Sequence, residues 1–261
     1  ADVDIRSWRL SGAGLARVSP FGYPIKPHVA KRIERLENGR IYIVHLRQGL
    51  RWSDGHPLDA DDLLYWWEHE VNDPLVGGTV PAWLTMEGKP AAITKLDPYT
   101  VRFEYSIPNA LFMEQLNLDS RVVFEPEHYL RPFHPSLGDP EFLKQKMKEY
   151  GVGSPRSLYG HIRQSFNPDH PRLWPWIYRT YRNVPPHVFV RNPYYYVVDE
   201  AGNQLPYIDR VQFDIQDSKM LAISAANGKV SMQGRHIFFD NYTELTSRSE
   251  KSGTRILHWY G

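Results

Sequence analysis

Residues 51–67 read RWSDGHPLDADDLLYWW, and the way this stretch folds decides the structure around it. Its acidic half could hold a calcium ion or begin a helix. An EF-hand loop needs oxygen ligands at alternate positions around a glycine, with a closing glutamate about six residues later. The aspartates Asp54, Asp59, Asp61 and Asp62 lack that spacing, and Pro57 interrupts it. We therefore interpret the stretch as scaffold and expect no metal there.

The same residues predict a turn followed by a capped helix. Asp54-Gly55 is a typical turn pair, and Asp59 stands where an N-cap side chain accepts backbone N–H bonds. Asp62 follows three residues later, as the third helical residue, and can return a bond to the cap as a variant capping box. The carboxylates also complement the positive end of the helix dipole, so each aspartate has a structural role that needs no ligand.

Hydrophobic periodicity predicts further strands and helices on both sides of this stretch. We expect strands at 40–47, 97–105, 188–190, 194–198, 211–215 and 255–260, and helices at 59–71, 110–116, 140–150 and 221–226. In the helix at 59–71, Trp66 and Trp67 share one side with Leu63, which places both tryptophans in the core. Strands and helices mix without strict alternation, which predicts an α/β (mixed α+β) fold with a mixed β-sheet and flanking helices.

Composition narrows the classes of function. The 261 residues include 31 Lys+Arg and 30 Asp+Glu, so the chain has no broad positive surface and we expect no nucleic acid partner. The sequence contains no cysteine, which excludes disulfides, thiolate metal sites and a cysteine nucleophile. Eight tryptophans and sixteen tyrosines suit either a ligand cleft or a core.

Four separated segments together resemble one protein family. They are LRQGLRWSDGHPLDADDLLYWW (46–67), DPYTVRFEYSIP (97–108), RNPYYYVVDEAGNQLPYIDRV (191–211) and LAISAANGKVSM (221–232). In this order they are similar to the extracytoplasmic solute-binding proteins of the oligopeptide and dipeptide ABC importers, family 5. The resemblance makes the turn and cap residues a structural motif: Trp52, Asp54, Gly55, Asp59 and Asp62.

The resemblance implies a fold and an organisation. We expect residues 1–261 to form the N-terminal, periplasmic-binding-protein-like lobe of a two-lobed protein whose second lobe is absent from this chain. Residues 26–125 would form a small inserted subdomain, and residues 1–25 with 126–261 the subdomain that forms the cleft.

It also implies a function. The chain would be a non-enzymatic, monomeric receptor without a cofactor, located outside the cytoplasm in the periplasm or anchored by lipid to the cell surface. It would capture an extended solute, first a peptide and alternatively an oligosaccharide, and deliver that solute to the permease subunits in the membrane. Because half of the cleft would be missing, we expect the chain alone to bind solute weakly or not at all.

The resemblance implies ligand contacts at the positions of this chain that match the contact positions of the family. They fall on Trp8 and Arg9 near the start, on Gln233, Gly234, Arg235 and His236 after Met232, and on Trp259 and Tyr260. Aromatic faces suit stacking on a sugar or a peptide side chain, while Arg and Gln fix polar groups. Core packing within a strand remains an equal alternative for Trp259 and Tyr260.

Histidines and paired carboxylates offer competing kinds of site. His128, His134, His161 and His170 do not pair at the three- or four-residue spacing of helical metal ligands, so we expect scattered surface histidines. A glycoside hydrolase would need two facing acids, one with a raised pKa. Glu68 and Glu70 follow on a helix that faces solvent in part, and Glu125 and Glu127 flank a proline in a loop.

Two other classes therefore stay open at this point. A carbohydrate-active hydrolase would turn over labelled oligosaccharide, whereas a binding protein would leave it unchanged. An adhesion or interaction domain would show no thermal shift with any pool of peptides or sugars.

Overall fold

The computed structural model describes residues 13–19, 22–118, 124–180, 185–234 and 237–258. The chain divides into two compact units, residues 1–212 and 213–261, and each is described by itself. Within the described ranges no helix combines the length and the hydrophobicity that crossing a membrane would require.

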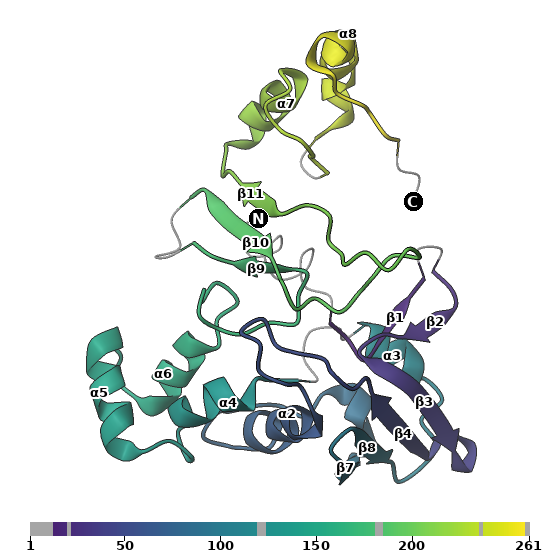
Figure 1. The fold of residues 1–261 in the computed structure, drawn as a ribbon, viewed down its shortest axis with the longest axis vertical. Helices are drawn as coiled ribbons and strands as arrows, with labels where there is room; N and C mark the ends of the chain where they lie inside the picture. Colours follow the sequence, from purple (N-terminus) through teal and green to yellow (C-terminus); the bar gives the residue numbers. More distant parts are fainter. Residues whose placement is uncertain (1–12, 20–21, 119–123, 181–184, 235–236, 259–261) are drawn as a thin grey trace. The chain divides into compact units, whose positions relative to one another are not determined.

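A four-stranded sheet with the order β3-β4-β8-β7 lies at the centre of the first unit (Figure 1). Its strands are β3 (Ala30–Leu36), β4 (Ile41–Leu46), β7 (Ala92–Asp97) and β8 (Thr100–Glu104). The predicted strands at 40–47 and 97–105 are confirmed as the two central strands, whose registered pairs Tyr42↔Phe103 and Val44↔Val101 are buried. The strand pairs of this four-stranded sheet are all antiparallel.

A tight turn joins β3 to β4. The residues of the short helix η2 (Glu37–Gly39) have positive φ angles of 47° at Glu37, 55° at Asn38 and 94° at Gly39. A Cβ at residue 39 would lie 2.9 Å from the hydroxyl oxygen of Tyr42. Glycine is therefore required there both by the backbone angle and by the close side chain.

The predicted helix at 59–71 is confirmed as two consecutive segments, α2 (Ala60–Tyr65) and the π-helix η3 (Trp66–Val71). Its N-terminus contacts the sheet, since the N–H of Ala60 donates to the Pro98 carbonyl at 2.9 Å. Leu63 and Trp66 are buried as predicted, whereas Trp67 packs against the core only in part.

A second, helical layer of this unit is built from α4 (Glu127–Leu130), η5 (Arg131–Phe133), α5 (Pro140–Tyr150) and α6 (Pro155–Ile162). The predicted helix at 140–150 is confirmed to the residue, with Asp139 as N-cap and Gly151 in the left-handed conformation at its end. Its small core joins Tyr65 of α2 to Leu130, Leu143, Leu158, Tyr159 and Ile162. The site described below lies where α2 and η3 meet this layer.

Short elements complete the first unit. They are β1 (Ala16–Val18), β2 (Ile25–Pro27), η4 (Ala82–Leu84), β5 (Thr85–Met86), β6 (Lys89–Pro90), α3 (Phe112–Leu118), β9 (Trp176–Tyr178), β10 (His187–Arg191) and β11 (Arg210–Phe213). The last three form a sheet with the order β11-β10-β9. The helix predicted at 110–116 and the strands predicted at 188–190 and 211–215 are thus present with shifted ends.

The strand predicted at 194–198 is wrong. Only a single bridge, Val198 to Gln204, forms there. The side chain of Asn192 accepts the N–H of Tyr194 at 2.9 Å, and the side chain of Gln204 donates to the Tyr195 carbonyl at 2.7 Å. Side chains therefore satisfy backbone groups that a neighbouring strand would otherwise bind.

The second unit consists of α7 (Ser218–Ala226), η7 (Phe239–Asn241) and α8 (Tyr242–Ser252) around a small core of Ala225, Ala226 and Leu245. The helix predicted at 221–226 is confirmed, and it ends at Asn227 as expected. The strand predicted at 255–260 is wrong in its described part, because residues 255–258 form no strand. The N–H of Thr254 instead closes the end of α8 by donating to the Ser249 carbonyl at 3.0 Å.

Candidate functional site

The ligand residues predicted by position fall mostly outside the described residues. Trp8, Arg9, Arg235, His236, Trp259 and Tyr260 all lie there. Gln233 is half-buried and Gly234 exposed in a loop of the second unit. Their grouping in one cleft stays a prediction.

The turn and cap motif at 52–62 is built as predicted. The Asp59 side chain accepts the N–H of Asp61 at 2.9 Å, and the N–H of Asp59 donates to Oδ2 of Asp62 at 3.3 Å, which completes the capping box. The Trp52 indole also donates to Oδ2 of Asp62 at 3.0 Å, and the N–H of Glu127 donates to its Oδ1 at 3.1 Å. The buried Asp62 carboxyl thus joins the turn, the helix and the start of α4.

Burial sets the ionisation of Asp62. It raises the pKa of this carboxyl to about 7, although the Trp52 indole and two backbone N–H donors favour the charged form. The Trp52 indole and the two backbone N–H donors hold the Asp62 carboxyl in place. Asp62 therefore serves as a structural junction, although its pKa is raised as in many catalytic acids.

The first and third family segments meet at the turn. Gly55 has a φ of +91°, and a Cβ at this position would lie 3.0 Å from the hydroxyl oxygen of Tyr194. Ser53 binds the segment before β9 twice: its N–H donates to the Arg172 carbonyl at 3.0 Å, and its hydroxyl accepts the Arg172 N–H at 2.9 Å. Segments far apart in the sequence are therefore fixed against the turn by direct contacts.

A shallow pocket of about 330 Å³ lies beside this junction. Its lining residues are Ser53, Asp54, Pro168, Asp169, His170, Pro171 and Arg179. Asp54 accepts from His128 Nε2 at 2.7 Å when that nitrogen carries a proton, and the His128 ring stacks on His56 with centroids 3.8 Å apart. The pocket thus offers two carboxylates and one guanidinium to polar groups.

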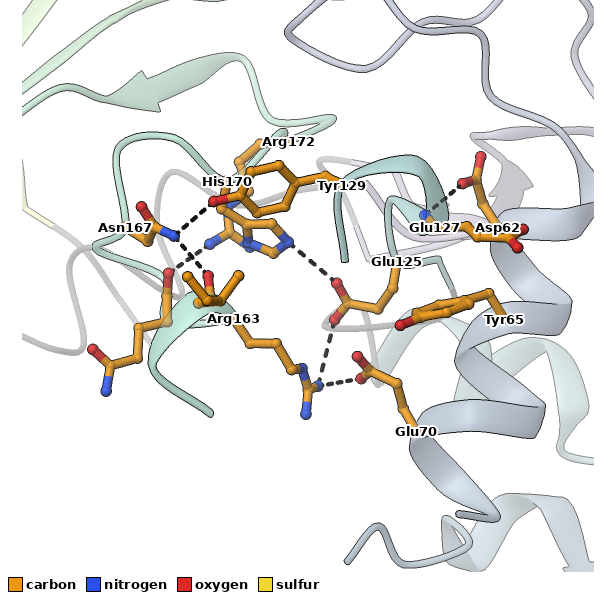
Figure 2. A network of polar contacts seen from close by, with 12 residues as sticks. Asp62, Tyr65, Glu70, Glu125, Glu127, Tyr129, Arg163, Asn167, His170 and Arg172 are labelled. Atoms are coloured by element: carbon orange, nitrogen blue, oxygen red, sulfur yellow. Dashed lines mark hydrogen bonds and ion pairs between the residues drawn. The ribbon is translucent and has the colours of Figure 1, made fainter. Parts of the chain in front are cut away.

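Beneath the pocket, two buried glutamates share one arginine (Figure 2). Arg163 forms an ion pair with Glu70 and lies 3.5 Å from Oε1 of Glu125, while Nε2 of His170 lies 3.5 Å from the other oxygen of Glu125. The Tyr159 hydroxyl donates to Glu70 at 2.5 Å. The helix faces solvent in part, as expected, at the exposed Glu68, but Glu70 is only 3% exposed.

The pKa values of the two glutamates are shifted in opposite directions. Burial, followed by the negative charge of Glu125, raises the pKa of Glu70. Burial acts the same way on Glu125, but its contact with His170 and the charge of Arg163 outweigh burial and lower its pKa. Burial and then the charge of Arg172 lower the pKa of His170 to about 4, so this imidazole is neutral at pH 7.

This pair does not have the geometry of a glycoside hydrolase. Such an enzyme needs two carboxyl groups that face each other across a sugar. Glu70 and Glu125 instead bind the same guanidinium and are 3% and 7% exposed, so a sugar has no access between them. The opposite pKa shifts of Glu70 and Glu125 therefore arise from a buried structural network and do not indicate a catalytic pair.

The expectation of scattered surface histidines is wrong for two of the four named residues. His134 and His170 are buried, with 0% and 1% exposure, whereas His161 is exposed. Sequence reasoning also missed Arg163 and Arg172, which anchor the network. No periodic or spacing signal marks them, because tertiary packing alone brings them to Glu125.

Comparison with known proteins identifies the family. The family description "Bacterial extracellular solute-binding proteins, family 5 Middle" matches residues 24–251. The chain is 34% identical over 214 residues to the periplasmic alpha-galactoside-binding protein of Rhizobium meliloti (strain 1021), covering 78% of this chain and 28% of that protein.

Solved structures agree with this family. A structure of an oligopeptide-binding protein OppA superposes with a TM-score of 0.88 at 35% identity, covering 96% of this chain and 40% of that one. The binding protein MelB of Agrobacterium fabrum C58 in complex with stachyose gives a TM-score of 0.72 at 25% identity, covering 95% and 35%. This chain thus spans 28–40% of the length of these relatives.

The superposed structures confirm the predicted α/β binding-protein lobe, and the relatives named here are binding proteins. The four sequence segments, the fold that they build and the match over residues 24–251 agree. The chain belongs to family 5 of the bacterial extracellular solute-binding proteins.

Proposed function

We propose that this chain forms part of the solute-binding component of an ABC importer, which captures an extended solute between two lobes and delivers it to the permease. The match over residues 24–251 carries the proposal. A probable ABC transporter-binding protein of Deinococcus radiodurans, 24% identical over 79% of this chain, supports the transport role. Relatives named as periplasmic support a location outside the cytoplasm. A monomeric state, in the periplasm or at a lipid anchor, is part of the same proposal.

For the solute we favour an oligosaccharide that carries α-galactosyl units. The alpha-galactoside-binding relative covers most of this chain, and MelB is a relative with a sugar, stachyose, in its complex. The many tryptophans and tyrosines suit sugar faces. A peptide, the solute first expected from the sequence, is the second candidate, because the structure at 35% identity is named as an oligopeptide-binding protein.

The ligand residues and subdomains expected from the sequence enter this proposal unchanged. Trp259 and Tyr260 would stack on the solute, while Gln233, Arg235 and His236 would bind its polar groups, together with Trp8, Arg9 and Gly234. Residues 1–25 and 126–261 would form this wall of the cleft, and residues 26–125 the small subdomain. Closure of a second lobe would supply the opposite wall.

A binding panel on the intact two-lobed protein tests the solute class. Stachyose, sucrose and a mixed tetrapeptide pool are added in turn, and the melting temperature is measured. Sucrose is the matched control, because it lacks the α-galactosyl units of stachyose. We expect stachyose, and no other solute of the panel, to raise the melting temperature. A higher melting temperature with peptides alone would select the second candidate. An unchanged melting temperature with every solute would contradict both candidates.

A substitution pair tests the ligand residues. Trp259→Ala is expected to weaken stachyose binding by about tenfold or more, because one stacked ring contributes more than 1 kcal/mol. Trp83→Phe, in the buried core of the first unit, is the control and should leave the affinity unchanged. Equal affinities for both variants would remove Trp259 from the site.

A further inference from the structure

One side-chain cluster of the first unit has no part in the proposed solute site. His69 lies on the π-helix η3, Asp73 follows it four residues later, and His134 lies just after η5. One ligand atom from each of the three lies within 4.8 Å of the others. Single π-helical turns occur frequently at functional positions, because the extra residue changes the direction of a side chain.

The donor set fits a transition metal better than calcium or magnesium. Two imidazole nitrogens and one carboxylate oxygen are ligands of Zn²⁺, whereas hard cations prefer oxygen alone. Nε2 of His134 lies 3.8 Å from Oδ2 of Asp73. Two ligand atoms about 2.1 Å from a tetrahedral zinc are about 3.4 Å apart, so a small movement would bring both to bonding distance.

The contacts around His134 show what zinc would replace. Its Nε2 donates to the His69 carbonyl at 2.8 Å, and its Nδ1 accepts from the Ser136 N–H at 3.3 Å. Zinc on Nε2 would replace this hydrogen bond, so the His69 carbonyl, 2.8 Å from Nε2, would have to turn aside, and Nδ1 would then carry a proton. The Ser136 hydroxyl, 3.0 Å from Nδ1, can accept that proton in a hydrogen bond.

The same hydroxyl also holds the second ligand. Ser136 Oγ donates to Oδ2 of Asp73 at 2.8 Å, while Oδ1 of Asp73 accepts the N–H of Leu75 at 2.7 Å. Outer contacts of this kind orient the ligands of metal sites. His134 is fully buried, and Asp73 and His69 are half-buried, so the ligands are held by packing with one side open to solvent.

We propose that His69, Asp73 and His134, which are not among the proposed solute ligands, form a three-ligand binding site for Zn²⁺ that fastens the end of η3 to the loop after η5. A fourth position would remain for water. Because the metal would bind the folded chain and link two segments, it would stabilise the fold.

Calorimetric titration of the chelator-treated chain with ZnCl₂ tests the site, with the melting temperature as a second readout. We expect one Zn²⁺ per chain and a higher melting temperature. His69→Gln and Asp73→Asn should each weaken binding by about tenfold or more. His161→Gln, at an exposed histidine on α6, is the matched control and should change nothing.

Two results would overturn the site. One is the absence of zinc binding by the unaltered chain, and the other is equal affinity for the unaltered chain, His69→Gln and Asp73→Asn. Circular dichroism of each variant establishes that it is folded before its titration is read. Co²⁺ in place of Zn²⁺ gives a separate readout, since tetrahedral nitrogen and oxygen ligation produces visible absorption that Asp73→Asn should reduce.

Discussion

A Cβ at Gly55 would lie 3.0 Å from the hydroxyl oxygen of Tyr194, so the turn after Trp52 and the hairpin segment after β10 meet at one glycine. Two segments of the family, about 140 residues apart in this sequence, therefore constrain each other directly. The backbone angle of the turn requires glycine, and an added Cβ would also have to displace the Tyr194 hydroxyl.

Replacement of that glycine is expected to be costly. Gly55→Ala should lower the free energy of unfolding by about 2–3 kcal/mol, from the strained φ and from the clash with Tyr194. Gly49→Ala is the matched control: φ is +82° and nothing lies within 4 Å of the added Cβ, so about 1 kcal/mol is expected. Urea denaturation of both variants measures the difference, and equal losses would show that the Tyr194 contact is unimportant.

The two aspartates of the capping box should differ in their effect on stability. Asp59→Ala removes a half-buried cap and should cost about 1 kcal/mol. Asp62→Ala leaves the Trp52 indole and the Glu127 N–H without their acceptor, and should cost about 3 kcal/mol or more. Chemical denaturation distinguishes these values. Asp59→Ala should leave the solute affinity of the intact protein unchanged, and a loss of affinity would contradict a purely structural role.

Two buried histidines that resist protonation should lower stability at acidic pH, whereas the raised pKa values of Asp62 and Glu70 act in the opposite direction. Burial, then the charge of Arg17, lowers the pKa of His28 from 6.5 to about 4, and burial lowers that of His170 similarly. Between pH 6.5 and 4 the unfolded chain binds these protons and the folded chain does not. Stability that is fully present above pH 6.5 is therefore lost as the pH falls toward 4, by up to about 3 kcal/mol for each histidine.

Urea midpoints measured from pH 7.5 to 4.5 test this dependence. Relative to the unaltered chain, His28→Gln should lose less stability between pH 7.5 and 4.5, whereas His161→Gln, at an exposed position, should follow the unaltered chain. Identical slopes for the unaltered chain and His28→Gln would contradict the role of His28.

The shared arginine should matter far more than a surface ion pair. Arg163→Met leaves the buried Glu70 and Glu125 without their cation, and should cost about 3–5 kcal/mol. Arg131→Met breaks the exposed pair with Glu127 and should cost about 0–1 kcal/mol. Adding Glu70→Gln to Arg163→Met should recover part of the loss. Equal costs for the two single variants, measured by denaturation, would contradict a buried network.

Hydrophobic alternation in the sequence predicted the two central strands of the main sheet but not its two edge strands. β4 and β8 alternate apolar residues because one face is buried, whereas β3 and β7 carry charged residues on exposed edges. Charged edge strands prevent pairing with other chains, and this hides them from a search for hydrophobic alternation. α8 was missed for a related reason: it is rich in Ser and Thr and buries only Leu245.

The candidate site was predictable only where residues are close in sequence. The capping box at Asp59 and Asp62 follows a local pattern and was predicted correctly. Arg163, His170 and Glu125 meet through tertiary packing, and the sequence contains no signal for that encounter. His69 and Asp73 do have helical spacing, but the third ligand of the proposed zinc site, His134, comes from a distant loop.

Calorimetric titration with stachyose, of the intact two-lobed protein and of this 261-residue chain, tests the proposed function most directly. The account predicts saturable binding without turnover by the intact protein. It predicts affinity weaker by about tenfold or more for the chain, because under the proposal a second lobe supplies the opposite wall of the cleft. Equal affinity for both would contradict closure of two lobes over the solute. Hydrolysis of stachyose, or binding of neither this sugar nor a peptide by the intact protein, would contradict the proposed function itself.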